Sequence, residues 1–350
     1  MYLVCFGTRP ELIKQIPIIQ KFKKEKVPFK TLFSGQHLNL IKQFLGYVDK
    51  PDYILPSVMK KDQSLNELVG KMLIKSQTIL ENNNFKVIVQ GDSSTSSTMA
   101  LSAFHNQNIV IHIEAGLRTH NKKSPFPEEV NRLNISNIAD VHFCPTKQAV
   151  INLKNEGITK NVYLTGNTVV DSYQFFSKNT APSSKINNFL TNQKNYIICT
   201  LHRRENRNRF KNFWKQLNEI TIKYPQYKIL YLQHPSVKDS EKNLNRNIIV
   251  MKPVSYVDMI HLIDNSSGII SDSGGIQEEV ISAKKKILVC RDNTERPETI
   301  ESGYGKLVND DIVSNFNFLT YENTKEAKNP YGKNVSDKIY KILESKLQNT

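Results

Sequence analysis

Residues 268–279 read Gly-Ile-Ile-Ser-Asp-Ser-Gly-Gly-Ile-Gln-Glu-Glu. The apolar first part predicts a buried strand, and the Gly-Gly pair predicts a tight turn that opens a helix. Such a helix start presents unpaired backbone N–H groups and the positive end of its dipole, which suits a phosphate group. Glu279 follows about one turn later, within reach of a ribose. The alternative is an ordinary helix start with a serine N-cap and acidic residues in its first turns.

The same alternation of apolar runs and helical segments recurs along most of the chain. Strands are predicted in the first half at 2–6, 29–33, 86–90, 109–113, 141–144 and 162–164, and in the second half at 196–200, 228–232, 248–251, 268–271 and 286–290. Helices are predicted between them, at 11–24, 64–82, 95–105, 128–138, 147–156, 209–222 and 256–264. Strands that alternate with helices are typical of βαβ units and a parallel sheet.

This pattern predicts an α/β protein with two Rossmann-like, doubly wound parallel-sheet domains. The polar stretch 178–195 interrupts the alternation. We therefore expect an N-terminal domain at 1–170 and a C-terminal domain at 171–335. Residues 336–350 hold an amphipathic helix that can pack back on the N-terminal domain.

Composition narrows the class of protein. The chain has 350 residues, 39% of them hydrophobic, and no apolar run approaches the roughly 20 residues that a membrane span needs. The N-terminus is too short in its apolar part for a signal peptide, so a cytoplasmic protein is expected. The cysteines lie in or beside apolar runs without C-x-x-C spacing, which predicts reduced core thiols: Cys5, Cys144, Cys199 and Cys290.

The net charge of +15 raises the question of nucleic-acid binding. The lysines are scattered along most helices, and only 284–286 form a cluster. Without a recognition motif, no nucleic-acid partner is expected, although a basic surface helps to gather an anionic small substrate. The sequence also lacks G-x-G-x-x-G after the first strand of either half, a Walker A lysine and a D-x-D pair, so neither a tightly held nicotinamide nor a metal-bound sugar nucleotide is indicated.

Polar side chains follow the predicted strands of the first half. Arg9 and Lys14 follow the first strand, and Asp92 and Glu114 follow those at 86–90 and 109–113. In open α/β sheets ligands bind beyond the carboxyl ends of the strands. Asp92 can also be read as an N-cap, and Glu114 at the end of an apolar run is costly unless paired or functional. Glu128 lies next to Pro127, which is predicted to be the first residue of a helix. Asp92, Glu114 and Glu128 together make three carboxylates suited to moving protons.

The second half has basic residues at the equivalent positions. His202 and Arg203 follow its first strand, His234 follows the next, and Arg296 trails the strand at 286–290. Lone histidines are usually structural, but His202 beside two arginines is well placed for phosphate. We therefore interpret the second half as a nucleotide clamp and the first half as the place of acid–base chemistry.

Ten segments in this order resemble the non-hydrolysing bacterial UDP-N-acetylglucosamine (UDP-GlcNAc) 2-epimerases, and together they span nearly the whole chain. They are FGTRPELIK at 6–14, SGQH at 34–37, GDSSTSS at 91–97, HIEAGLRT at 112–119, SPFPEEVNR at 124–132, TGNTVVD at 165–171, HRREN at 202–206, SDSGGIQEE at 271–279, RDNTERPE at 291–298 and NPYG at 329–332. The resemblance implies a fold similar to GT-B glycosyltransferases, with the active site in the cleft between the domains.

The resemblance also implies a reaction and its residues. UDP is eliminated to give 2-acetamidoglucal and added back to give UDP-ManNAc for cell-surface polysaccharide, without a cofactor or metal, in a homodimer. Asp92, Glu114 and Glu128 would be the acid–base groups, and His202 would help UDP to leave. Arg9 and Lys14 would contact the nucleotide or its phosphates, Arg132 would lie near the carboxylates, and Ser273, Gly274 and Gly275 would hold the phosphates. Glu279 would bind the ribose and Arg296 the nucleotide end.

A second UDP-GlcNAc acts as an activator in bacterial members of that family. By resemblance its site would include Gln36, His37, Arg203 and His234. Lys71 stands where the family pattern has an arginine, which weakens a bidentate phosphate grip.

Several departures from the family pattern leave more than one function open. Arg207-Asn208-Arg209 lacks an expected glycine, Lys333-Asn334 replaces Asp-Gly, and Val254 and Met259 replace residues around the uracil. A related epimerase acting on a modified UDP-HexNAc fits these changes. A hydrolysing epimerase that releases ManNAc and UDP, a GT-B glycosyltransferase and an inactive nucleotide-sugar sensor are the competing hypotheses.

Overall fold

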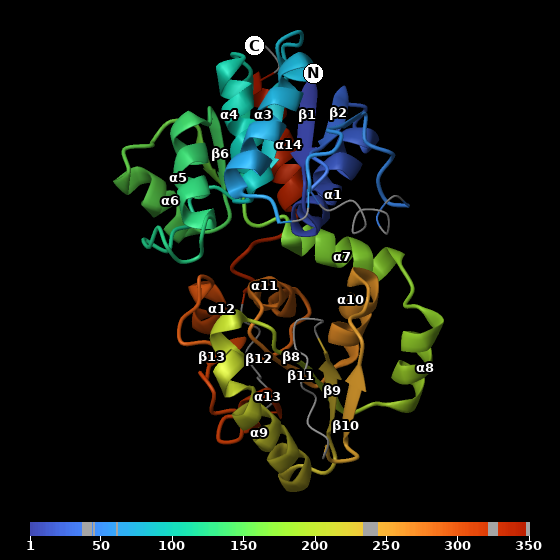
Figure 1. The fold of residues 1–350 in the computed structure, drawn as a ribbon. Coiled ribbons are helices and arrows are strands. Elements are labelled where there is room, and N and C mark those ends of the chain that lie inside the picture. The colour runs from blue at the N-terminus through green and yellow to red at the C-terminus, as the bar shows by residue number, and fades with distance from the viewer. Residues whose placement is uncertain (37–43, 45, 61, 234–243, 321–327, 348–350) are drawn as a thin grey trace. The chain divides into compact units, whose positions relative to one another are not determined.

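A computed structural model describes residues 1–36, 44, 46–60, 62–233, 244–320 and 328–347. The chain divides into two compact units (Figure 1). The N-terminal unit comprises Met1–Ser172 and Tyr331–Thr350, and the C-terminal unit comprises Tyr173–Pro330.

The N-terminal unit is built on a parallel sheet with the strand order β3-β2-β1-β4-β5-β6-β7 in the part of the chain that the structure describes. Its strands are β1 (Tyr2–Phe6), β2 (Phe29–Phe33), β3 (Tyr53–Ile54), β4 (Lys86–Gln90), β5 (Ile109–Ile113), β6 (Val141–Cys144) and β7 (Val162–Leu164). Its helices are α1 (Arg9–Lys24), α3 (Leu65–Leu80), α4 (Ser94–His105), α5 (Glu128–Ile138), α6 (Lys147–Asn155) and α14 (Val335–Leu347). The strand order reverses between β1 and β4, which is where such sheets bind ligands.

The C-terminal unit repeats this plan with the order β10-β9-β8-β11-β12-β13 and reverses between β8 and β11. Its strands are β8 (Tyr196–Thr200), β9 (Lys228–Leu232), β10 (Ile248–Met251), β11 (Gly268–Ser271), β12 (Ile287–Val289) and β13 (Gly305–Leu307). Its helices are α8 (Ser184–Asn192), α9 (Phe210–Lys223), α10 (Tyr256–Asn265), α11 (Gly274–Ser282), α12 (Pro297–Glu301), α13 (Asn317–Thr320) and the 3₁₀ helix η2 (Arg204–Arg209). Helix α7 (Val169–Asn179) crosses the boundary between the units.

The predicted fold class is confirmed, since both sheets are parallel and alternate with helices. The strand predictions hold, with β12 one residue shorter at each end. The short strands β3 and β13 were not predicted because two or three residues carry no periodicity. Helix α8 was also missed, because it buries only Ile186 and lies inside the polar stretch 178–195.

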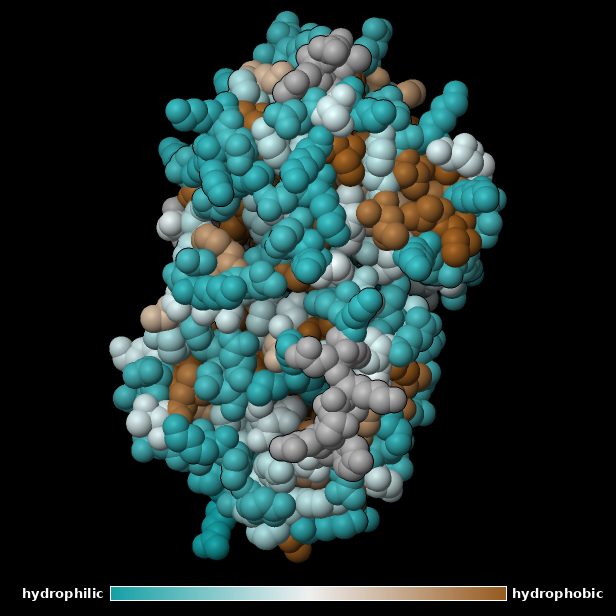
Figure 2. All heavy atoms as spheres, turned by 180° about the vertical axis from the view of Figure 1, so that it is seen from behind, coloured by the Kyte–Doolittle hydropathy of each residue, from teal (hydrophilic) through white to brown (hydrophobic). Residues whose placement is uncertain are grey.

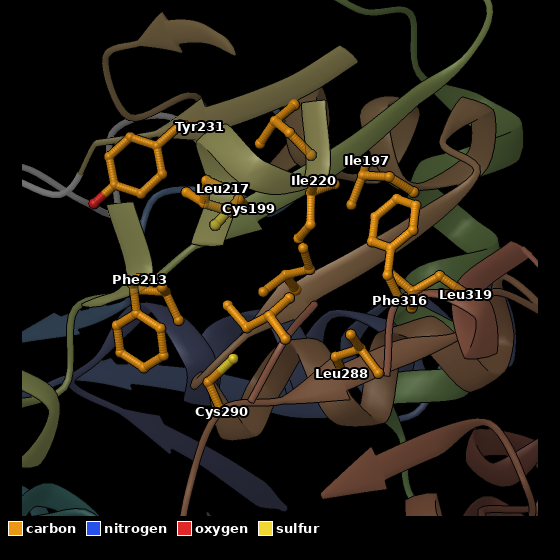
Figure 3. Close-up of a cluster of buried hydrophobic side chains, with 14 of the residues drawn as sticks. Ile197, Cys199, Phe213, Leu217, Ile220, Tyr231, Leu288, Cys290, Phe316 and Leu319 are labelled. Atoms are coloured by element: carbon orange, nitrogen blue, oxygen red, sulfur yellow. The ribbon is translucent and has the colours of Figure 1, made fainter. Parts of the chain in front are cut away.

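The core of the C-terminal unit packs helix α9 and the segment around Phe316 against the sheet (Figure 3). Cys199 and Cys290 contribute thiols to this cluster, where Figure 3 shows them among aliphatic and aromatic side chains. All four cysteines are buried, as predicted, and none forms a disulfide; burial raises the pKa of the Cys199 thiol. These cysteines therefore act as small apolar residues.

Helix α14 packs against α1 within the N-terminal unit (Figure 1). Lys21 on α1 forms an ion pair with Asp337 at 2.7 Å. The carboxylate of Asp171 accepts hydrogen bonds from the backbone N–H groups of Val335 and Ser336 at 3.1 and 2.6 Å. Asp171 therefore satisfies donors at the start of α14.

Hydrophilic side chains predominate on the face of the molecule that Figure 2 shows. Among the described residues, no helix combines the length and apolar character that a membrane crossing requires.

Candidate active site

The turn between β1 and α1 is held by Glu11, a buried residue. One carboxylate oxygen accepts from the N–H groups of Gly7 and Thr8 at 3.1 and 2.7 Å and from the Thr8 hydroxyl at 2.7 Å. The other accepts from the hydroxyls of Ser93 and Ser96 at 2.5 and 2.6 Å. Glu11 thus joins the loops after β1 and β4, on both sides of the point where strand order reverses.

Lys14 and Glu114 meet at this edge of the sheet. Glu114 is only 7% exposed and follows β5 in a left-handed conformation, with φ of 68°. The Lys14 ammonium lies 2.9 and 2.7 Å from the two oxygens of Glu114, and the Gln90 amide also donates to this carboxylate. The pairing that the buried position of Glu114 requires is therefore present.

Asp92 forms an ion pair with Arg132. The distance from Asp92 Oδ2 to Arg132 Nη2 is 2.6 Å, and Asn131 donates to the Asp92 carbonyl at 2.9 Å. Asp92 is not the N-cap of α4, because Ser93 fills that position and accepts from the Ser96 N–H. Helix α5 thus reaches over to the loop that carries Asp92.

Arg132 is held from its other side by Glu129, at 2.8 Å. Glu129 also accepts from the N–H groups of Thr119 and His120 at 2.8–3.0 Å. Burial alone would raise the pKa of Glu129, but the bonds from Thr119, Arg132 and His120 hold it below the ordinary value. Glu129 therefore serves as a charged anchor that positions Arg132.

Glu128 is the first residue of α5, and Pro127 is its N-cap rather than its first helical residue, which corrects the sequence prediction. The Oε2 atom of Glu128 is buried and has no hydrogen-bond partner among the described residues. A carboxylate oxygen buried without a donor is costly. This feature distinguishes Glu128 from Asp92 and Glu114, whose carboxylates are both paired with cations.

Arg9 begins α1 and is partly exposed. Neither an ion pair nor a hydrogen bond joins its side chain to another residue that the structure describes. The loops and helices at this sheet edge therefore carry the three predicted carboxylates and the three predicted cations of this half. Two of the cations, Lys14 and Arg132, are paired with carboxylates.

In the C-terminal unit, the loops after β8 and β11 are joined by Asp272, which is 0% exposed. Its carboxylate accepts from the N–H groups of His202 and Arg203 and from the Asn206 amide, all at 2.9 Å. The His202 ring lies 3.2 Å from Asp272. Burial would raise the pKa of Asp272, but the contacts with His202, Arg203 and Asn206 lower it. Asp272 therefore fixes His202 beside the start of α11.

Helix α11 begins at Gly274, after the N-cap Ser273, whose side chain makes no capping bond. A Cβ atom on Gly275 would meet nothing within 4 Å, so its backbone can be approached closely. A Cβ atom on Gly274 would lie 2.8 Å from the Glu295 carboxylate. The predicted phosphate residues therefore form an uncapped helix N-terminus, the arrangement that favours an anion.

Arg296 lies behind this helix start. Its Nε donates to Glu278 at 2.5 Å, and Arg296 and Glu278 are both buried. Glu279 is 9% exposed. The structure thus places Arg296 and Glu279 on or against α11, within the same unit as His202.

Glu295 carries the most strongly shifted carboxyl of this cluster. Burial would raise its pKa, but the charges of Arg296 and Arg291 hold the pKa at about 2, below the ordinary value of 4.5. A carboxyl whose pKa is lowered by folding stabilises the fold above its ordinary pKa and loses that contribution as the pH falls toward the lowered value.

The Glu295→Gln variant tests whether the contribution of Glu295 to stability falls as the pH is lowered. The difference in free energy of unfolding between the wild type and the variant is expected to be largest at pH 7 and to shrink below about pH 4.5. Urea titrations of both proteins between pH 7 and pH 3 measure it. A difference that stays constant over this range would contradict the assignment.

The residues predicted for an activator site are only partly described. Gln36 accepts from the Thr95 hydroxyl at 2.9 Å, and Arg203 lies 4.0 Å from Glu295. His37 and His234 lie outside the described residues. Lys71 donates to Gln63 at 3.4 Å.

Sequence reasoning missed three buried carboxylates: Glu11, Glu129 and Asp272. Glu11 had a detectable signal, because Thr8 and Glu11 have the spacing of a capping box. Glu129 and Asp272 lie inside quoted motifs, but their roles depend on backbone groups from distant loops.

Comparison with known proteins gives a consistent result. A family model described as UDP-N-acetylglucosamine 2-epimerase matches residues 20–344. The UDP-N-acetylglucosamine 2-epimerase of Campylobacter jejuni is 39% identical, over 97% of this chain and 96% of that protein.

Solved structures agree with this similarity. The UDP-GlcNAc 2-epimerase of Neisseria meningitidis bound to UDP-GlcNAc has a TM-score of 0.87 and 34% identity, over 98% of this chain and 99% of that one. The Methanocaldococcus jannaschii UDP-GlcNAc 2-epimerase in complex with UDP-GlcNAc and UDP has a TM-score of 0.84 and 33% identity, over 99% of this chain and 100% of that one. A glycosyltransferase of Streptomyces nogalater, 10% identical with a TM-score of 0.60 over 98% of each chain, shares the fold alone.

Proposed function

This chain belongs to the UDP-N-acetylglucosamine 2-epimerase family, and we propose that it is a non-hydrolysing isomerase that interconverts UDP-GlcNAc and UDP-ManNAc. The observation that carries the proposal is the group of carboxylates at the sheet edge of the N-terminal unit. Asp92 and Glu114 are paired with Arg132 and Lys14 at 2.6 and 2.7 Å, and Glu128 has a buried oxygen with no partner among the described residues. Carboxylates are groups that accept and return protons in general acid–base catalysis.

In the proposed reaction, the C1–O bond to UDP breaks and the diphosphate oxygen keeps the electron pair. The proton on C2 passes to a carboxylate, and the C1=C2 double bond of 2-acetamidoglucal forms. UDP then adds back at C1 while C2 receives a proton on its opposite face. Asp92, Glu114 and Glu128 are the proposed acid–base groups of these two proton transfers.

The C-terminal unit is the proposed holder of UDP. The helix start at Ser273, Gly274 and Gly275 offers N–H groups to the diphosphate, and His202 lies beside it on the loop that Asp272 anchors. Negative charge develops on the diphosphate as the C1–O bond breaks, and such donors stabilise it. Glu279 is the proposed ribose ligand and Arg296 the proposed contact of the nucleotide end, while Arg9 and Lys14 are the proposed nucleotide contacts of the N-terminal unit.

Finer parts of the proposal rest on the family resemblance. We propose a homodimer in the cytoplasm that supplies ManNAc for cell-surface polysaccharide. A second UDP-GlcNAc is the proposed activator, at a site that includes Gln36, His37, Arg203 and His234. Neither a metal nor an organic cofactor takes part in the proposed reaction.

Product identification tests the proposal. The purified chain is incubated with UDP-GlcNAc, and the products are separated by anion-exchange chromatography. UDP-ManNAc is expected, in equilibrium with the substrate and without accumulation of UDP. Free ManNAc together with equimolar UDP would identify a hydrolysing epimerase instead. Parallel reactions with modified UDP-HexNAc substrates test the alternative specificity, which a higher kcat/KM than that for UDP-GlcNAc would establish.

A further inference from the structure

His112 is a buried histidine at the sheet edge that has no part in the reaction proposed above. It is the fourth residue of β5, is 0% exposed and lies two residues before Glu114. Its Nε2 atom lies 2.8 Å from the carbonyl oxygen of Gly91. Because a carbonyl oxygen only accepts, Nε2 carries the proton of this bond.

The peptide that His112 contacts is the one that leads into Asp92. Gly91 has φ of 69°, and its N–H donates to the Ile113 carbonyl at 2.9 Å. The Gly91–Asp92 turn is therefore held from β5 through both polar groups of Gly91. A Cβ atom on Gly91 would lie 4.0 Å from the Glu114 carboxylate, so this turn lies directly beside the second carboxylate.

We propose that His112 is a positioning residue, which sets the Asp92 carboxylate against Glu114 by fixing the Gly91 carbonyl. This inference rests on the proposed epimerase function, because that function gives Asp92 a role in proton transfer that depends on precise placement. Without the His112 bond, the peptide between Gly91 and Asp92 can rotate, and the Asp92 side chain changes direction with it. Ion pairing with Arg132 fixes the far end of that side chain, and the Asn131 bond holds the Asp92 carbonyl on the following peptide. Neither contact holds the peptide between Gly91 and Asp92 itself.

The chemistry of the ring suits this role. Burial is the main cause that lowers the pKa of His112 to about 3; the bond to Gly91 opposes it, and the charges of His142, Arg118 and Arg132 add to the lowering. The ring therefore stays neutral over the range in which an enzyme of this kind is assayed. A neutral ring donates through Nε2 without adding charge beside the Asp92–Arg132 pair.

His142 provides a matched control. It lies on β6 directly opposite His112 in the sheet register, so the two side chains emerge on the same face. It is also buried, at 2% exposed, and burial lowers its pKa to about 4. Its backbone contact is Ala139, which precedes β6, at the end of the strand remote from Asp92.

The test compares His112→Val, His112→Gln and His142→Val with the wild type in the epimerase assay. His112→Val is expected to lower kcat about 100-fold, because a small displacement of a catalytic group has an effect of this order. KM is expected to stay within about threefold, since the substrate contacts are unchanged. His112→Gln, whose amide N–H can reach the Gly91 carbonyl, is expected to recover kcat to within about tenfold of the wild type. His142→Val is expected to keep kcat within about threefold.

Circular dichroism and thermal melts of the variants accompany the kinetics. Equal losses of kcat in His112→Val and His142→Val, or no recovery in His112→Gln, would overturn the positioning role while leaving the epimerase function intact. An inactive wild type would contradict the proposed function itself, and the positioning role would fall with it. The two failures are therefore distinguishable.

Discussion

The Glu128→Gln variant is expected to lose turnover by about 10²–10⁴-fold while its stability changes little. Glutamine keeps the shape of the side chain but cannot accept a proton from carbon at neutral pH. Because Glu128 Oε2 has no partner among the described residues, the substitution breaks no observed bond at that oxygen. The free energy of unfolding is therefore expected to change by less than about 1 kcal/mol. Initial rates of UDP-ManNAc formation and urea unfolding curves measure both quantities.

The adjacent Glu129→Gln variant is the control. Glu129 accepts bonds from Thr119, His120 and Arg132 as a charged group. Removal of its charge is expected to lower the free energy of unfolding by about 2–3 kcal/mol. A Glu128→Gln variant with wild-type turnover would exclude Glu128 from the chemistry, whatever the behaviour of Glu129.

Gly116→Ala is expected to be the most destabilising of the substitutions considered, at about 3–5 kcal/mol. Gly116 follows Glu114 in the loop after β5 and has φ of 84°, a conformation that an alanine adopts only with strain. A Cβ atom there would also lie 2.3 Å from the Ala149 carbonyl oxygen and 2.9 Å from its carbon. Since both atoms belong to the backbone of α6, the clash is relieved only by moving that helix. Urea unfolding monitored by circular dichroism measures the loss.

Gly157→Ala separates strain from clash. Gly157 has φ of 82°, but a Cβ atom there meets nothing within 4 Å. Only the cost of the left-handed conformation applies, which is about 1–2 kcal/mol. Equal losses in the two variants would show that the contact with α6 is relieved without cost.

Much of the fold was predictable because parallel strands buried on both faces are continuous apolar runs. The runs at 2–6, 109–113 and 196–200 coincide with β1, β5 and β8. Periodicity is a property of the local sequence, so it is lost where an element is as short as β3, which has two residues. Helix α8 keeps apolar residues at i, i+3 and i+4, namely Ile186, Phe189 and Leu190, but the polar stretch around them obscured this pattern.

The partners of the site residues were less predictable than their positions. A polar residue at a strand end can be located from the sequence, which is why Asp92, Glu114 and His202 were found. Which cation pairs with which carboxylate depends on the order of strands in the sheet. Glu114 contacts Lys14 across 100 residues, and Asp272 binds the backbone of His202 across 70 residues. Such contacts leave no periodic signal, so sequence reasoning about local motifs does not reveal them.

Proton exchange at C2 distinguishes proton transfer from every non-chemical role of the carboxylates. The wild-type chain is incubated with UDP-GlcNAc in D₂O, and the sugar protons are followed by proton NMR. We expect UDP-ManNAc that carries deuterium at C2, because the proton removed by the carboxylates is replaced from solvent when UDP adds back. UDP-ManNAc that retains the substrate proton at C2, or tight binding of UDP-GlcNAc without any exchange, would contradict the elimination mechanism.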